Sequence, residues 1–150
     1  MSSQDLRARA EGLFAAWNRR DYDEVTKYLS PDIVLVDHIR RTTVNGPDGY
    51  MDRFKPMMDA FADMVGEITS LAVNGNIAAL ETVWHGTHTS PLVLPSKRVI
   101  EPTNQQVTVY IAVLIECDQA GRVTAIRTYG NPTESILDLR VTSSLAGGTG

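Results

Sequence analysis

The chain has 150 residues, 43% of them hydrophobic and 21% charged, which is the balance of an ordinary globular domain. Its net charge is -4 at pH 7, and its Lys and Arg residues occur singly or in pairs, which argues against a nucleic-acid or anionic-membrane surface. No apolar run approaches the ~20 residues of a membrane helix, and the N-terminus lacks the pattern of a signal peptide. The single cysteine, Cys117, cannot form an internal disulfide, so a cytoplasmic protein is expected.

Two helices are predicted at the N-terminus. The first is indicated by apolar residues that recur at helical spacing, namely Leu6, Ala10, Leu13, Phe14 and Trp17. Asp21 is a suitable N-cap for a second, short helix from Tyr22 to Leu29, which Ser30-Pro31 should end.

A strand and a third helix follow. Residues 33–38 begin with apolar side chains and end in Asp37 and His38, which predicts a strand that is buried at its start and polar at its end. Asn45-Gly46-Pro47-Asp48 is a helix-start signal, and Pro56 should kink or split the helix that it opens. The apolar face of that helix consists of Tyr50, Phe54, Met57, Met58 and Phe61.

The second half of the chain predicts two β-hairpins. Strands at 67–73 and 77–88 are joined by Asn-Gly, the strongest short hairpin signal. Runs rich in β-branched residues at 107–115 and 123–129 are joined by a turn in which Gly121 can take a positive φ. The loop from Ser90 to Thr103 has no readable pattern.

Helices followed by an antiparallel meander indicate an α+β fold. We expect one domain over residues 1–150, with an ordered core over about 5–140, a short helix over 133–140 and a disordered tail over 141–150. The helices should cover one face of a curved antiparallel sheet, giving a cone whose mouth is a natural small-molecule pocket.

The last predicted strand carries an unusual set of side chains. Because side chains alternate along a strand, Ala125, Arg127, Tyr129 and Asn131 share one face. That face either meets solvent or lines a pocket with a polar floor.

Several phrases, in this order along the chain, resemble the SnoaL-like polyketide cyclase family. They are Ala16-Trp17-Asn18-Arg19-Arg20-Asp21-Tyr22-Asp23, Gly46-Pro47-Asp48-Gly49, Phe61-Ala62-Asp63-Met64, Asn74-Gly75-Asn76-Ile77-Ala78 and Gly86-Thr87-His88. The resemblance covers roughly residues 6 to 139 and implies the cone-shaped nuclear transport factor 2-like fold. It implies less about the reaction, because this superfamily contains cyclases, isomerases, epoxide hydrolases, dehydratases and binding proteins.

One position departs from the family. Cyclases of this family place an acid/base Asp near the end of the last strand, where this chain has Asn131, and an amide cannot exchange a proton at neutral pH. Residues 127–131 also resemble the Arg-Asp-Tyr-Phe-Asp run of limonene-epoxide-hydrolase-like relatives, but Thr128 and Asn131 replace both Asp residues. Water activation by a carboxylate at those positions is therefore not expected.

A catalytic base would have to come from elsewhere. Asp37 or His38 could supply it, and only one of the two can point inward; an apolar cone would raise the pKa of the carboxyl group. The alternative for both is a solvated strand end. His88 is a further catalytic candidate, with a structural histidine as the alternative.

Oxygen recognition is expected from Arg127, Tyr129 and Asn131, whose donors could steady a carbonyl or an enolate. For Arg127 the alternative is a salt bridge to Glu81 or another strand carboxylate. Candidate substrate-binding residues are Trp17, Tyr50, Phe54, Met57, Met58, Trp84 and Tyr110, although most such apolar stripes are simply core.

No metal or cofactor site is expected. The three histidines do not have metal-ligand spacing, and there is no phosphate-binding loop, dinucleotide fingerprint or serine nucleophile elbow. Exposed sheet surface, formed by Val107, Val109, Ile111 and Val113 or their alternates, predicts a homodimer.

Two function hypotheses follow. The first is a cofactor-independent cyclase or isomerase that acts by acid–base chemistry on a polyketide-like or terpenoid-like carbonyl substrate. The second is a non-catalytic small-molecule binding protein, with an epoxide-hydrolase-like or dehydratase relative as a further alternative.

Overall fold

The computed structural model describes residues 1–132 and 137 of the chain. The expected helix over 133–140 and the expected disordered tail therefore lie, apart from Leu137, outside the described residues. No helix in the described part of the chain is long and apolar enough to cross a membrane.

Helices α1 (Ser3–Arg19), α2 (Tyr22–Tyr28) and α3 (Gly46–Ala60) form where the sequence predicts them. Ser2 and Asp5 make a reciprocal capping box at the start of α1, and Asp21 caps α2 through the backbone N–H of Glu24. Pro56 lies inside α3, which continues as one helix to Ala60, so the expected split does not occur.

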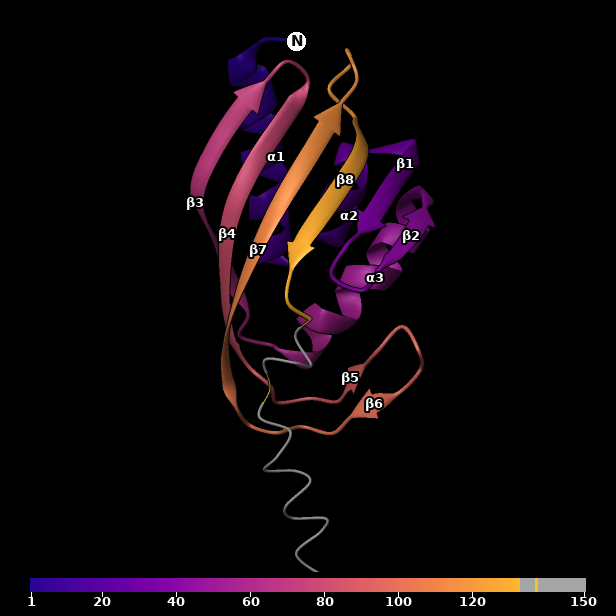
Figure 1. Cartoon of the computed structure of the whole chain (residues 1–150), viewed down its shortest axis with the longest axis vertical. Coiled ribbons are helices and arrows are strands. Elements are labelled where there is room, and N and C mark those ends of the chain that lie inside the picture. Colours follow the sequence, from indigo (N-terminus) through magenta and orange to yellow (C-terminus); the bar gives the residue numbers. More distant parts are fainter. Residues whose placement is uncertain (133–136, 138–150) are drawn as a thin grey trace, which may run out of the picture.

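A six-stranded sheet has the order β2-β1-β8-β7-β4-β3 (Figure 1). Its strands are β1 (Leu29–Asp37), β2 (Thr42–Asn45), β3 (Val65–Asn74), β4 (Ile77–Thr87), β7 (Gln106–Cys117) and β8 (Val123–Gly130). The two predicted hairpins, β3–β4 and β7–β8, are present, and Gly75 and Gly121 take positive φ values of 60° and 82° in the turns, as expected for Gly121.

The sheet is mixed, so the expectation of a purely antiparallel sheet is wrong. β1 runs parallel to β8, with Val36 opposite Arg127 and Asp37 opposite Thr128. These two strands are far apart in the sequence, and no local turn signal fixes their relative direction.

Three short strands were not expected. β2 pairs with the end of β1, and β5 (Leu92–Val93) pairs with β6 (Val99–Ile100) within the loop that had no readable pattern. Strands of two to four residues are too short to show a periodicity in the sequence.

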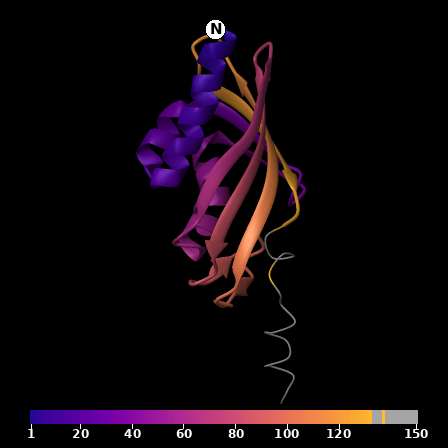
Figure 2. The same cartoon turned by 90° about the vertical axis from the view of Figure 1, so that its left-hand side faces the viewer.

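All three helices lie on one side of the curved sheet (Figure 2). We call that side of the sheet the inner face and the opposite side the outer face. Along β7, Val109 and Ile115 on the inner face are buried, whereas Tyr110 on the outer face is 71% exposed. The structure thus confirms the α+β cone, and the space between the helices and the inner face contains the candidate site.

Candidate functional site

A cavity of about 130 Å³ lies between the helices and the inner face of the sheet. It is almost entirely apolar. Its apolar and aromatic lining residues are Ala10, Leu13, Phe14, Trp17, Ile39, Tyr50, Phe54, Met57, Met58, Met64, Leu80, Trp84, Val109, Ile111, Val113, Ile115 and Ile126. A wall of this kind suits a hydrophobic small molecule.

Aromatic side chains from α1 and α3 form one end of the wall. Trp17 Nε1 donates a hydrogen bond of 2.9 Å to the hydroxyl of Tyr50, and the rings of Tyr50 and Phe54 pack edge to face with centroids 5.0 Å apart. Burial raises the pKa of Tyr50, although the bond from Trp17 acts in the opposite direction. The phenol therefore stays protonated at neutral pH and can act as a donor.

Trp84 forms another part of the wall, 4.8 Å from the ring of Phe14. Its indole lies across Gly66 of the neighbouring strand, where an added Cβ would come within 2.6 Å of the ring. Gly66 therefore provides the space that Trp84 occupies.

Six of the seven residues predicted to wall a pocket line this cavity, namely Trp17, Tyr50, Phe54, Met57, Met58 and Trp84. Their role in binding stays a prediction. Tyr110 does not join them, because it lies on the outer face, opposite in parity to Val109 and Ile111.

Three polar residues complete the lining: Arg40, Thr128 and Asn131. Arg40 comes from the loop between β1 and β2, and its side chain is only 12% exposed. Its Nε is buried and has no hydrogen-bond partner among the described residues. The described wall includes no Asp, Glu or His.

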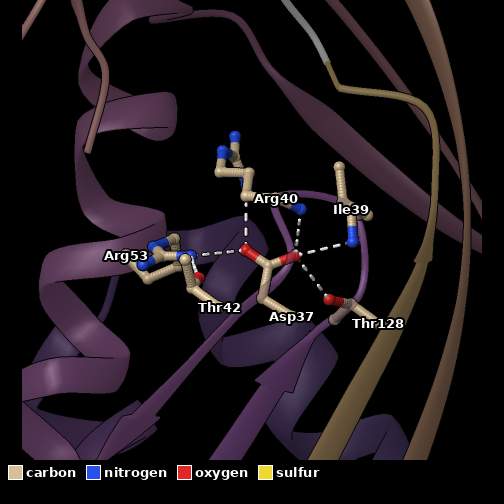
Figure 3. A network of polar contacts seen from close by, with 6 residues as sticks. All are labelled: Asp37, Ile39, Arg40, Thr42, Arg53 and Thr128. Carbon is tan, nitrogen blue, oxygen red and sulfur yellow. Dashed lines mark hydrogen bonds and ion pairs between the residues drawn. The ribbon is translucent and has the colours of Figure 1, made fainter. Parts of the chain in front are cut away.

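Asp37 holds this polar end together (Figure 3). Its Oδ2 accepts from Arg53 Nη1 at 2.7 Å and from Arg40 Nη1 at 3.3 Å. Its Oδ1 accepts from the backbone N–H groups of Ile39 and Arg40, at 3.0 and 3.2 Å, and from the hydroxyl of Thr128 at 3.2 Å. The carboxylate thus joins the end of β1, the following loop, α3 and β8.

These contacts make Asp37 a poor base. Burial raises the pKa of its carboxyl group, but the hydrogen bond from Arg53, the Arg40 backbone and the two guanidinium charges together outweigh burial, so the pKa lies below its ordinary value. The expectation of a raised pKa is therefore wrong. The two arginines that lower this pKa approach Asp37 from a loop and from α3, and no pattern in the sequence predicts that both meet there.

His38 points to the outer face, where its ring stacks on Tyr129 with centroids 4.6 Å apart and planes 15° apart. Arg127 also lies on the outer face and pairs with Glu116 of β7. The expectation that these three side chains face a pocket is wrong, because Ile126 and Thr128 occupy the inner positions of β8. The alternative stated for Arg127, a salt bridge to Glu81 or another strand carboxylate, is the one observed, and the carboxylate is that of Glu116.

Asn131 lines the cavity although Arg127 and Tyr129 do not. It follows the end of β8 at Gly130, so strand alternation no longer governs its direction. A Cβ on Gly130 would come within 2.7 Å of the Tyr110 carbonyl oxygen, so this close passage of the chain over β7 requires glycine. A role for Asn131 in recognition stays a prediction.

His88 is fully buried but does not line the cavity. Its Nδ1 accepts from the backbone N–H of Thr103 at 3.2 Å, and its ring stacks on Phe61 at 5.2 Å. Burial lowers the pKa of the imidazole, against a smaller raising effect of the Ser90 backbone. These contacts match the structural alternative, because they fix the segment that follows β6 to the end of β4.

Arg40 and Arg53 are the residues of this polar end that the sequence analysis did not single out. One local signal was present, since Arg40 lies three residues after Asp37, a spacing at which a turn can bring the two together. Arg53 offered no such signal.

The described residues contain no group of three or more His, Cys, Asp or Glu side chains that could hold a metal ion.

Comparison with known proteins adds a family and a fold. Residues 10–126 match the family model described as the SnoaL-like domain. No curated protein matches the chain significantly.

Solved structures share the fold. AclR from Streptomyces galilaeus, a candidate hydroxylase, is 24% identical with a TM-score of 0.75 over 87% of this chain and 91% of its own. A candidate SnoaL-like polyketide cyclase from Jannaschia sp. CCS1 is 16% identical with a TM-score of 0.74, covering 96% of this chain and 94% of its own. IdmH from Streptomyces antibioticus, a candidate polyketide cyclase, is 17% identical with a TM-score of 0.71, covering 87% and 94%.

Proposed function

The chain belongs to the SnoaL-like domain family, and from that premise we propose that it is a cofactor-independent cyclase or isomerase. Its substrate would be a polyketide-like or terpenoid-like carbonyl compound of natural-product biosynthesis. The observation that carries this proposal is the position of Arg40, which lies at the polar end of a largely apolar cavity and whose Nε has no hydrogen-bond partner among the described residues.

Arg40 can bind a substrate carbonyl oxygen and stabilise the enolate that forms from it. A hydrogen-bond donor that is held in place before the reaction, in surroundings that exclude water, stabilises developing negative charge more strongly than water does. Asp37 fixes the guanidinium through Nη1, so that little reorganisation is needed during the reaction. Asn131 and the hydroxyl of Tyr50 are further donors for substrate oxygens.

The described wall supplies no carboxylate or imidazole that could remove a proton. The reaction that fits such a wall is one whose substrate enolises readily, such as a compound with a methylene group between two carbonyls. Ring closure would then join the enol carbon to a second carbonyl carbon. The enol oxygen becomes a carbonyl oxygen again, and the proton that its hydroxyl loses passes to the oxygen of the second carbonyl. The protein's contribution is to bind the folded substrate and stabilise the oxygen anion.

A turnover assay with 1,3-dicarbonyl compounds that can cyclise tests this proposal. Arg40→Gln is expected to lower kcat by roughly 100-fold, which is typical for the loss of one oxyanion donor. Arg41→Gln, which changes an exposed arginine one residue further along, is the matched control and should leave the rate unchanged. Equal rates in Arg40→Gln and the wild type would refute the role of Arg40.

The second candidate function is that of a non-catalytic small-molecule binding protein. The lack of a carboxylate or histidine on the described cavity wall favours it. Tight binding of carbonyl compounds, with no product after prolonged incubation, would support this alternative. An epoxide hydrolase or dehydratase is less well supported, since Thr128, at a position where such relatives have Asp, donates its hydroxyl to Asp37.

A further inference from the structure

Among the described residues, the charges at the polar end of the cavity do not cancel. Arg40 and Arg53 each carry a positive charge, and Asp37 is the single carboxylate that pairs with both of them among the described residues. Two guanidinium groups and one carboxylate leave one positive charge. All three side chains are at most 12% exposed, so water screens that charge poorly.

Arg53 uses its contacts within the protein. Its Nη1 lies 2.7 Å from Asp37 and 2.5 Å from the hydroxyl of Thr42, and it does not line the cavity. The shorter of the two ion pairs with Asp37 belongs to Arg53, at 2.7 Å against 3.3 Å for Arg40. The uncompensated charge is therefore best assigned to Arg40, which faces the cavity.

The two edges of the Arg40 guanidinium differ. Nη1 bonds to Asp37, and Nε makes no hydrogen bond to the described residues. Nε and Nη2 lie on one edge of the planar group and point their N–H bonds in the same direction, which is the geometry that grips a carboxylate by two parallel hydrogen bonds. Nε is buried as well as unpartnered among the described residues, so a ligand that pairs with this edge must displace the side chains that cover Nε.

We infer that the natural ligand is an apolar carboxylic acid, bound as its anion with the carboxylate on the Nε–Nη2 edge of Arg40 and the ring system against the aromatic wall. This inference rests on the proposed function in that it takes the same cavity as the ligand site. It changes the substrate oxygens that Arg40 binds from a carbonyl or enolate to a carboxylate, and leaves Asn131 and the Tyr50 hydroxyl as the donors for carbonyl oxygens. A neutral ester or amide of the same shape makes the same contacts with the aromatic wall but leaves the positive charge of Arg40 unpaired.

The test compares two probes of nearly equal shape, 2-naphthoate and 2-naphthamide, by calorimetric or fluorescence titration of the full chain at pH 7. Naphthoate is expected to bind at least about 10-fold more tightly, which corresponds to the lower range for hydrogen bonds to charged groups. In Arg40→Gln the ratio of the two affinities should fall to about one, because naphthoate loses much more affinity than naphthamide. Arg41→Gln should keep the wild-type ratio.

Melting temperatures establish that the variants are folded. If Arg40→Gln does not fold, Arg40→Lys is used instead, because lysine keeps the charge but cannot form two parallel hydrogen bonds to a carboxylate. In Arg40→Lys the ratio of naphthoate to naphthamide affinity should fall by at least about threefold. An unchanged ratio in either variant would overturn the inference.

The outcomes separate this inference from the proposed function. Equal binding of the two probes to the wild type would overturn the anionic ligand class and leave the cavity as a binding site for neutral carbonyl compounds. Binding of neither probe would count against both the inference and the assignment of the cavity as the ligand site.

Discussion

Two arginine–carboxylate groups lie on opposite faces of the same sheet and differ in nearly every physical respect. On the inner side, the side chain of Asp37 is 0% exposed, and those of Arg53 and Arg40 are 8% and 12% exposed. On the outer face, Arg127 and Glu116 form an ion pair in which the two side chains are 26% and 28% exposed. Water screens the outer pair, so it should contribute little to stability, whereas the inner group cannot lose its carboxylate without leaving buried charges unpaired.

The two groups also differ in how visible they are in the sequence. Arg127 and Tyr129 are two residues apart on one strand, so the sequence alone shows that they share a face. It does not show whether that face points toward the helices or toward solvent. The inner group is assembled from a strand end, a loop, a helix and a distant strand. Its members carry no shared pattern in the sequence, although they lie at the cavity.

Removing the inner carboxylate should have the largest effect. Asp37→Asn keeps the shape of the side chain but leaves Arg40 and Arg53 buried without a counter-charge, so the free energy of unfolding should fall by about 3–5 kcal/mol. Urea denaturation measures this loss.

The matched change on the outer face is Glu116→Gln. Because that pair is partly exposed, the free energy of unfolding should change by less than about 1 kcal/mol. Equal losses for the two variants would remove the distinction between the inner and outer groups.

The pH dependence of the free energy of unfolding should show the contribution of the inner carboxylate, Asp37. The pKa of Asp37 is lower in the folded protein than in the unfolded chain, so its contribution is present in full above the unfolded value of about 3.9 and is lost as pH falls through the folded value. The stability difference between wild type and Asp37→Asn should therefore be constant near neutral pH and shrink below about pH 4. A difference that stays constant down to pH 2 would contradict the assigned direction.

The outer face also bears on assembly. Val107 and Val109 are buried, and Ile111 and Val113 line the cavity, so the exposed surface of β7 comes from their alternates, led by Tyr110. We propose that this face forms a homodimer. Tyr110→Lys should shift the chain from dimer to monomer in sedimentation analysis and leave naphthoate binding unchanged. A wild-type monomer at micromolar concentration would contradict the proposal.

The fold was predictable where the signals are local. The apolar stripe of α1 and the turns at Gly75 and Gly121 led to the correct elements, and the aromatic wall followed from the faces of α1 and α3. The parallel pairing of β1 with β8 was not predictable, because the two strands are far apart in the sequence and no local turn signal fixes their relative direction. Arg40 was missed for a similar reason, since the cavity that it lines is formed with residues of α3 and β8, which are distant in the sequence.

The arginine Nε–H resonances of the isotope-labelled protein test most directly whether ligands bind at Arg40. The resonance of Arg40 is assigned by its loss in Arg40→Lys, and that of Arg127 by its loss in Arg127→Lys. On addition of 2-naphthoate, we predict that the Arg40 resonance moves and its exchange with water slows, because the free Nε–H gains a charged acceptor, while the Arg127 resonance stays in place. A shift of Arg127 with no change at Arg40 would contradict the assignment of the inner cavity as the ligand site.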